Sequence, residues 1–302
     1  MIIFLVLVGF SHQALAATSG RSSDESLEAC RKEIETSICW TNSKDFKRSA
    51  LEPGYKRSCL PGGREKFRSH VLDIYDRLPP AFQDVVCSVD TIYIEQDIEA
   101  VAYAGVNGGR SAIGFRQSVI ENAISIEDLY TWKEQLIFKK GTPYPRWSPE
   151  LPRYVTTGEI LPNSGLLFVL IHELSHLVDL QNGIQSRWNL PEWDSGRHRW
   201  TSGTKSVWSY RGSISFYGQG SSIYPTFADQ LYESLRASSF ISAYAMTNAF
   251  EDFAETMAYL VMLEYYGYEI RIMIGDQVVF DARKQLASPQ MKWKADFIRA
   301  LF

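Results

Sequence analysis

The segment Leu170–Val178 contains residue types that bind metals, at the spacing that a metal site needs. It reads Leu-Ile-His-Glu-Leu-Ser-His-Leu-Val, so that His172 and His176 are four residues apart and Glu173 follows the first histidine. Residues four apart in a helix lie one turn apart on the same face, and both imidazoles can then reach one zinc ion. Glu173 lies beside them, where it can take a proton from a metal-bound water. The pattern therefore predicts zinc binding and hydrolytic chemistry.

Apolar residues surround this motif on both sides. Residues 166–171 are all apolar, and Leu177, Val178 and Leu180 follow the second histidine. This pattern predicts a buried helix over residues 166–180. Buried imidazoles and a buried carboxylate need partners, and a metal ion supplies one. The alternatives are a polar cluster satisfied by other side chains, or an exposed histidine pair.

A catalytic zinc site needs a third protein ligand and an open fourth position. The sequence predicts a second helix over residues 248–266, in which Glu251 and Glu255 share a face that is otherwise largely apolar. One carboxylate can bind zinc while the other holds a zinc-bound imidazole from its second ring nitrogen. The alternative is an acidic cluster that only suits the positive end of the helix dipole.

Two other residues are candidates for the third ligand. Asp179 comes three residues after His176 and lies near the metal face, although supporting a ligand or capping the helix fits it better. His198 lies in a polar segment, Gly-Arg-His-Arg, which indicates the surface. Asp179 and Asn182 occupy the offsets at which metzincins have glycine and histidine, so that class is excluded.

The two segments together resemble the gluzincin metallopeptidases, and most closely the family of catalytic domains similar to that of anthrax toxin lethal factor. The resemblance rests on His-Glu-Leu-Ser-His-Leu-Val-Asp at 172–179 and on residues 244–255, which begin with tyrosine and end in Glu-Asp-Phe-Ala-Glu. It implies a zincin-like domain in which His172, His176 and Glu251 bind zinc.

The resemblance also implies roles for three neighbouring residues. Glu173 would be the general base, Glu255 would orient a zinc-bound histidine, and Tyr244 would stabilise the oxyanion of the tetrahedral intermediate. The matching segments cover a small part of the chain, and the interval from His176 to Glu251 is longer than in the toxin domain. Nothing resembles the toxin's targeting domains, so its host-kinase specificity does not carry over.

The remaining pattern predicts an α+β fold with a small early antiparallel sheet and a helical active-site half. Strands are expected at 91–95, 101–103 and 112–115, the last two flanking the turn signal Asn-Gly-Gly at 107–109. Further helices are expected at 26–39, 65–78, 126–137, 228–236, 281–286 and 292–301, and loops at 41–63, 138–165 and 181–225. We expect three regions: a signal peptide at 1–16, a helical N-terminal region at 17–90 and a catalytic domain at 91–302.

The first sixteen residues have the pattern of a secretory signal. An apolar run over residues 2–10 is followed by Gln-Ala-Leu-Ala, with small residues at the positions that a signal peptidase reads. The run is too short to span a bilayer, so an uncleaved anchor is disfavoured. The chain is therefore expected to be exported, either to a periplasm or to the exterior.

The four cysteines, Cys30, Cys39, Cys59 and Cys87, all lie in the N-terminal region. An even number in an exported chain predicts two disulfides, with four buried free thiols as the alternative. If Cys30 and Cys39 lie on one helix, they are roughly 13 Å apart, beyond disulfide reach. Each is therefore predicted to pair with Cys59 or Cys87.

Charge and composition restrict the partners. The formal net charge of -4 shows no basic surplus, which argues against nucleic-acid binding, and no apolar run is long enough for a membrane span. The segment 186–214 contains Trp188, Trp193, Trp200 and Trp208 with interleaved basic residues. It is either a substrate-binding flap or an ordinary long surface loop.

These observations predict a zinc-dependent endopeptidase with a peptide or protein substrate. An exported zinc hydrolase that cuts cell-wall peptides would use the same ligands. A non-catalytic protein with structural zinc is the third possibility, which the presence of all the expected catalytic residue types disfavours.

Overall fold

The computed structural model describes residues 23–42, 58–96, 98, 100–107, 109–138, 150–158, 161–188, 193–194, 199–200 and 223–301. Its helices are α1 (Ser23–Ser37), α2 (Gly63–Tyr75), α3 (Pro80–Cys87), α4 (Gln117–Glu121), α5 (Ile126–Gln135), α6 (Ser164–Asn182), α7 (Ala228–Arg236), α8 (Ala249–Glu264), α9 (Ala282–Leu286) and α10 (Lys292–Arg299). Its strands are β1 (Ile38–Thr41), β2 (Thr91–Glu95), β3 (Ala102–Asn107), β4 (Arg110–Arg116), β5 (Arg153–Thr157), β6 (Trp193–Asp194), β7 (Arg199–Trp200), β8 (Glu269–Ile274) and β9 (Gln277–Asp281). The fold is α+β with small sheets, as expected. The predicted signal peptide lies outside the described residues.

The first sheet has the strand order β1-β2-β4-β3. The predicted hairpin is confirmed, because β3 and β4 pair antiparallel from Ala102↔Phe115 to Asn107↔Arg110. The expectation of an antiparallel sheet holds for this pair only, since β2 pairs parallel with both β1 and β4. The chain leaves β2, forms β3 at the outer edge and returns through β4 between them, which makes the β2–β4 pair parallel. β1 lies before residue 90 and β2 after it, so this sheet crosses the expected region boundary.

The second sheet, β5-β8-β9, was not predicted. β5 lies inside the expected 138–165 loop. It has only five residues, and the prolines and glycines around it favour the prediction of a loop. The sequence of β8 could have predicted a strand, because Ile270 and Ile272 alternate with polar residues. Both isoleucines are buried in the structure. β9 then pairs antiparallel with β8 to complete a hairpin near the C-terminus.

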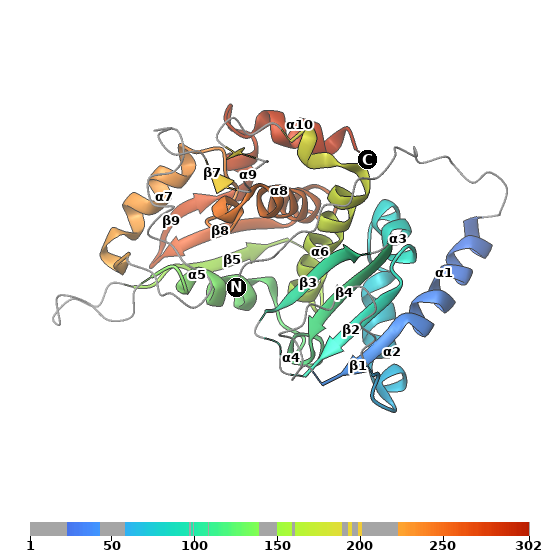
Figure 1. The fold of residues 1–302 in the computed structure, drawn as a ribbon. Helices are drawn as coiled ribbons and strands as arrows, with labels where there is room; N and C mark the ends of the chain where they lie inside the picture. Colours follow the sequence, from blue (N-terminus) through green and yellow to red (C-terminus); the bar gives the residue numbers. More distant parts are fainter. Residues whose placement is uncertain are drawn as a thin grey trace.

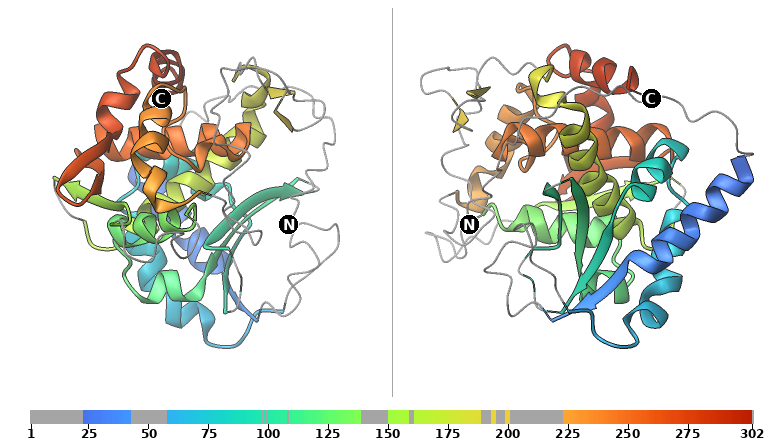
Figure 2. Two further views of the ribbon diagram at one scale, coloured as in Figure 1. Left: turned by 90° about the vertical axis from the view of Figure 1, so that its left-hand side faces the viewer. Right: turned by 45° about the vertical axis from the view of Figure 1, so that its right-hand side comes forward.

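The long helix α6 lies between the two sheets (Figure 1 and Figure 2). It contacts β3 and β4 of the first sheet, and it packs against α5 and α8 on the other side. Every residue from Ser164 to Ser175 is buried, which agrees with the apolar run in the sequence. The helix that carries both histidines is therefore fixed on several sides by the core.

Within the described residues, no helix has both the length and the apolar character that crossing a membrane requires.

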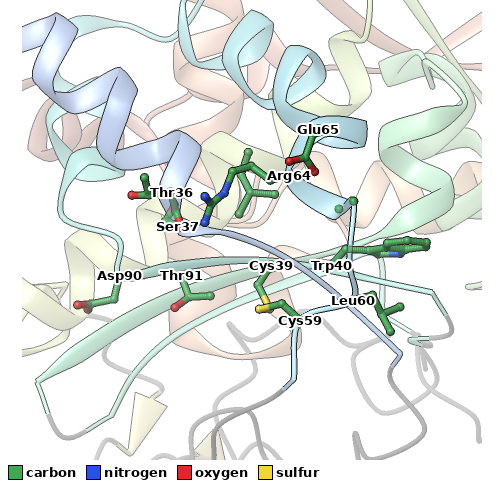
Figure 3. Close-up of a pocket in the computed structure, with 13 residues that line it drawn as sticks. Thr36, Ser37, Cys39, Trp40, Cys59, Leu60, Arg64, Glu65, Asp90 and Thr91 are labelled. Carbon is green, nitrogen blue, oxygen red and sulfur yellow. Dashed lines mark hydrogen bonds between the residues drawn. A yellow bond between two sulfur atoms is a disulfide. The ribbon is translucent and has the colours of Figure 1, made fainter.

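Two disulfides join the N-terminal elements. Cys30 pairs with Cys87 and Cys39 with Cys59, which confirms that Cys30 and Cys39 each bond to one of the later cysteines. The predicted helix over 26–39 is wrong at its end, because α1 ends at Ser37 and Cys39 lies on β1. The Cys39–Cys59 bridge lines a pocket of about 350 Å³ between β1 and the start of α2 (Figure 3). Disulfides are typical of proteins that fold in oxidising compartments.

Both ends of α6 depend on glycine, for different reasons. A Cβ at Gly165 would lie 2.6 Å from Ile124 O and 2.8 Å from Ser125 O, so only glycine allows α6 to approach the start of α5 this closely. Gly183 ends the helix with φ of 58°, a left-handed conformation, and a Cβ there would meet nothing within 4 Å.

We expect Gly165→Ala to destabilise the protein by about 1–3 kcal/mol, because backbone oxygens cannot move aside as a flexible side chain can. Gly183→Asn is the matched control at the other end of the same helix, since asparagine tolerates the left-handed conformation, and it should cost less than about 0.5 kcal/mol. Urea denaturation of both variants measures the difference. Equal stabilities would show that the α5–α6 approach is not as tight as described.

Candidate metal centre

Three side chains from α6 and α8 converge on one point. The Nε2 atoms of His172 and His176 are 3.2 Å apart. Glu251 Oε2 is 3.0 Å from the first of these nitrogens and 3.4 Å from the second. Among the described residues, this is the one group of three or more potential metal ligands whose donor atoms come together in this way.

The spacing of these donor atoms fits zinc. Ligands at 2.0–2.1 Å from a tetrahedral zinc ion lie about 3.3 Å from one another. The three observed separations, 3.0, 3.2 and 3.4 Å, are close to this value. Two imidazoles and one carboxylate are also ligands that zinc takes in catalytic sites, and three protein ligands leave a fourth position for water or substrate.

The N-terminal cap of α8 places Glu251. Asn248 Oδ1 accepts hydrogen bonds from the backbone N–H groups of Phe250 (2.9 Å) and Glu251 (3.0 Å). With Asn248 as the cap, the helix begins at Ala249, so Glu251 lies in the first turn and faces α6. Burial raises the pKa of Glu251, but His176 and His172 outweigh it and hold that pKa well below its usual range. The carboxylate is therefore ionised, as a metal ligand must be.

Glu255, one turn further along α8, supports His172 from behind. Its Oε1 lies 3.2 Å from His172 Nδ1. It also accepts hydrogen bonds from Tyr130 (2.8 Å), Lys133 (3.3 Å) and Ser242 (2.7 Å). Burial raises the pKa of Glu255, but Lys133, His172 and Ser242 outweigh it and lower the pKa to about 2. The structure thus brings Glu255 to the second ring nitrogen of a candidate ligand, as the resemblance implies.

Glu173 and Tyr244 lie beside the triad, by which we mean His172, His176 and Glu251. Glu173 is buried, and burial raises the pKa of its carboxyl above the ordinary value. The Tyr244 ring lies 6.0 Å from the His172 ring, between centroids. Lys133 Nζ lies 3.3 Å from the centroid of the same tyrosine ring. Glu173 and Tyr244 therefore lie near the same point as the three donor atoms and Glu255.

Asp179 does not join the three donor atoms. Its carboxylate accepts hydrogen bonds from Gln185 N (3.0 Å) and Gln185 Nε2 (2.7 Å), and so it closes the C-terminal end of α6. Burial raises its pKa to about 6, although Gln185 and His176 oppose the shift. His198 lies outside the described residues.

The proposed flap at 186–214 is only partly described, and its first tryptophan does not belong to a flap. Trp188 is buried, and its ring packs 5.2 Å from Phe253 and 5.5 Å from Phe297, between centroids. Most of the remaining segment lies outside the described residues. Trp188 is thus a core residue that anchors the chain after α6.

Sequence reasoning missed the residues that hold Glu255. Tyr130 and Lys133 lie on α5, and Ser242 lies in the segment before α8; none belongs to a recognisable motif. Tertiary packing alone brings them to the carboxylate. The pocket shown in Figure 3 contains none of the triad or its supporting residues.

The sequence matches no known family profile and no curated protein. Among solved structures, a protein of Bacteroides caccae ATCC 43185, described provisionally as a zinc-binding metallo-peptidase, aligns over 93% of this chain and 86% of its own, with 12% identity and a TM-score of 0.37.

A further buried carboxyl lies behind the site, on the same helix as Lys133. Glu134 is 3% exposed and accepts a hydrogen bond from Tyr232 (2.7 Å). Burial raises its pKa from 4.5 to about 7; the charge of Glu255 adds to this rise, whereas Tyr232, Lys133 and Tyr154 oppose it. The folded protein therefore holds this proton at a pH where the unfolded chain has lost it.

This difference predicts a pH-dependent effect of Glu134→Gln. The contribution of Glu134 to stability is fully present below about pH 4.5 and is lost as the pH rises to about 7. The neutral amide does not titrate, so the variant should gain roughly 2–3 kcal/mol relative to the wild type between pH 4.5 and pH 8. Urea denaturation of both proteins at these two pH values measures the gain. A stability difference that does not change with pH would contradict the prediction.

Proposed function

We propose that this protein is a zinc-dependent peptidase. The observation that carries the proposal is the convergence of His172, His176 and Glu251 at zinc-like spacing, with the buried Glu173 directly beside it. Zinc bound at this site would polarise the carbonyl of a peptide bond and make water acidic enough to ionise near neutral pH.

The surrounding side chains suit the remaining steps. Glu173 takes a proton from the attacking water and delivers it to the leaving amine. Its raised pKa helps it to hold that proton between the two transfers. The Tyr244 hydroxyl donates a hydrogen bond to the carbonyl oxygen as negative charge develops there. Glu255 keeps the His172 ring in the orientation that ligation needs.

The substrate we propose is an extended peptide that binds along β3. This strand ends the order of the first sheet, so one of its edges has no neighbouring strand among the described residues. It also packs against α6, which carries both histidines. Main-chain hydrogen bonds to this edge would hold a peptide next to the metal centre without demanding a particular sequence.

The two disulfides support a place of action outside a reducing compartment. We propose that the protein is exported, to a periplasm or beyond the cell, with residues 1–16 removed.

Zinc analysis of the purified chain tests the ligand set. The wild type should carry about one zinc per chain, and Glu251→Ala should lose most of it, because one of three protein ligands is gone. Glu264→Ala is the matched control on the same helix, since Glu264 pairs with Arg299 at the surface and should leave the zinc content unchanged. Zinc retained by Glu251→Ala would rule out Glu251 as a ligand.

Glu173→Gln separates an enzyme from a zinc-binding protein without activity. The amide has the shape of the carboxylate but cannot accept the proton, so the variant should keep its zinc and lose about 10²–10⁴-fold in kcat. Turnover of a fluorogenic peptide library at matched zinc occupancy measures the loss. Equal cleavage by both proteins would exclude Glu173 as the base, and no cleavage by the wild type would favour a non-catalytic zinc protein.

A further inference from the structure

Lys294, on the C-terminal helix α10, is 0% exposed. Lysine is almost never fully buried unless it is paired. Here the Nζ atom lies 2.6 Å from Asp252 Oδ2, and Asp252 is also 0% exposed. The same carboxylate oxygen accepts a hydrogen bond from Trp188 Nε1 at 2.9 Å. Asp252 directly follows Glu251, so this buried pair fixes the turn of α8 that carries the candidate zinc ligand.

Lys294 also holds a second segment of the site. Its Nζ donates a hydrogen bond to the backbone carbonyl of Ser239. Residues 238–244 lead from there to Ser242, which donates to Glu255, and to Tyr244. A single ammonium group therefore joins the helix that carries Glu251 to the segment that carries the tyrosine.

The helix α9 also holds this part of the chain. Gln285 Nε2 donates to the carbonyl oxygens of Leu235 (3.3 Å), Ser238 (3.0 Å) and Phe240 (3.0 Å). The Lys294 Nζ additionally lies 4.9 Å from the ring centroid of Phe240. This segment is thus fixed by directed contacts from α9 and α10 rather than by apolar packing alone.

The energetics of buried ion pairs bear on why these charges are present. Removing a lysine and a carboxylate from water costs several kcal/mol for each ion, and a hydrophobic pair of similar volume is often as stable. Net stability is therefore a weak reason for a pair at this position. A pair whose bonds have fixed directions can instead set the rotation of α8 about its axis, which decides where the Glu251 carboxylate points.

We propose that Lys294 is a positioning residue of the metal centre, acting through Asp252 on Glu251 and through Ser239 on the segment that leads to Tyr244. The inference rests on the proposed function, because it assigns Lys294 to the same zinc site. It implies that the C-terminal helix, although distant in sequence from the histidines, sets the zinc affinity of the site.

The test is the zinc affinity of the double variant Lys294→Met, Asp252→Asn in the full chain. Methionine fills the space of the lysine stem, and asparagine keeps an oxygen for Trp188, so no unpaired charge is left buried. We expect zinc to bind about 10-fold more weakly, as when outer partners of metal ligands are removed. Competition with a chromophoric chelator measures the dissociation constant, at a temperature where circular dichroism shows each protein fully folded.

Lys292→Met is the matched control, because Lys292 lies on the same helix with a side chain that is 68% exposed and pairs only with Asp296 among the described contacts. It should bind zinc as tightly as the wild type. Unchanged affinity in the double variant would overturn the inference, whereas a wild type without zinc would overturn the proposed function as well. A wild type that binds zinc but cleaves no peptide would remove the peptidase proposal and leave the affinity test of Lys294 intact.

Lys294→Gln with Asp252→Asn keeps the test decisive if the methionine variant does not fold. Two neutral amides can hydrogen-bond to each other, but glutamine is shorter than lysine and cannot reach both residue 252 and the Ser239 carbonyl as Lys294 does. We expect a loss of zinc affinity of roughly two- to five-fold. Wild-type affinity in this folded protein would overturn the inference.

Discussion

The imidazole of His172 is held from both of its nitrogens by carboxylates of one helix. Nε2 lies 3.0 Å from Glu251 and Nδ1 lies 3.2 Å from Glu255, four residues later on α8. These two contacts tolerate little movement of α8 relative to α6. A shift by one residue moves a helix about 1.5 Å along its axis, and the rotation that goes with it would turn both carboxylates away from the imidazole. The rest of the structure must therefore keep α6 and α8 in one register.

The buried charges around the site oppose the close packing of α6 and α8. Glu173, Glu251 and Glu255 are all buried near the same point, and Lys133 is the ammonium that reaches Glu255. A divalent cation among these groups would bring the formal charge of three carboxylates and one ammonium to zero. Ionised groups are costly to bury unless they are paired or bind metals, and this balance agrees with a metal centre.

The sequence predicted the parts of the site that depend on local spacing. His172 and His176 share a helix face, as do Glu251 and Glu255, and both helices were predicted close to their observed bounds. It could not predict what lies behind Glu255, because Tyr130, Lys133 and Ser242 reach it only through tertiary packing. The second sheet was missed where short strands lie among prolines and turns, although the alternation in β8 was visible. The parallel pairing of β2 with β4 depends on where β3 docks, which periodicity does not encode.

The two halves of the molecule are secured against α6 by different chemistry. On the N-terminal side, the Cys30–Cys87 bridge ties α1 to α3, which packs on α6, and the Cys39–Cys59 bridge holds the chain next to β1. On the C-terminal side, a buried ion pair, Lys294 with Asp252, ties α10 to α8. A disulfide limits the separation of two segments and adds no charge. The disulfides therefore add no buried charge next to the first sheet, whose β3 edge is the proposed place for a substrate. An ion pair fixes direction as well as distance, and α8 must present one carboxylate oxygen to two imidazoles. Because Glu251 must be placed precisely, an ion pair is found next to it, although burying an ion pair costs more free energy than a disulfide does.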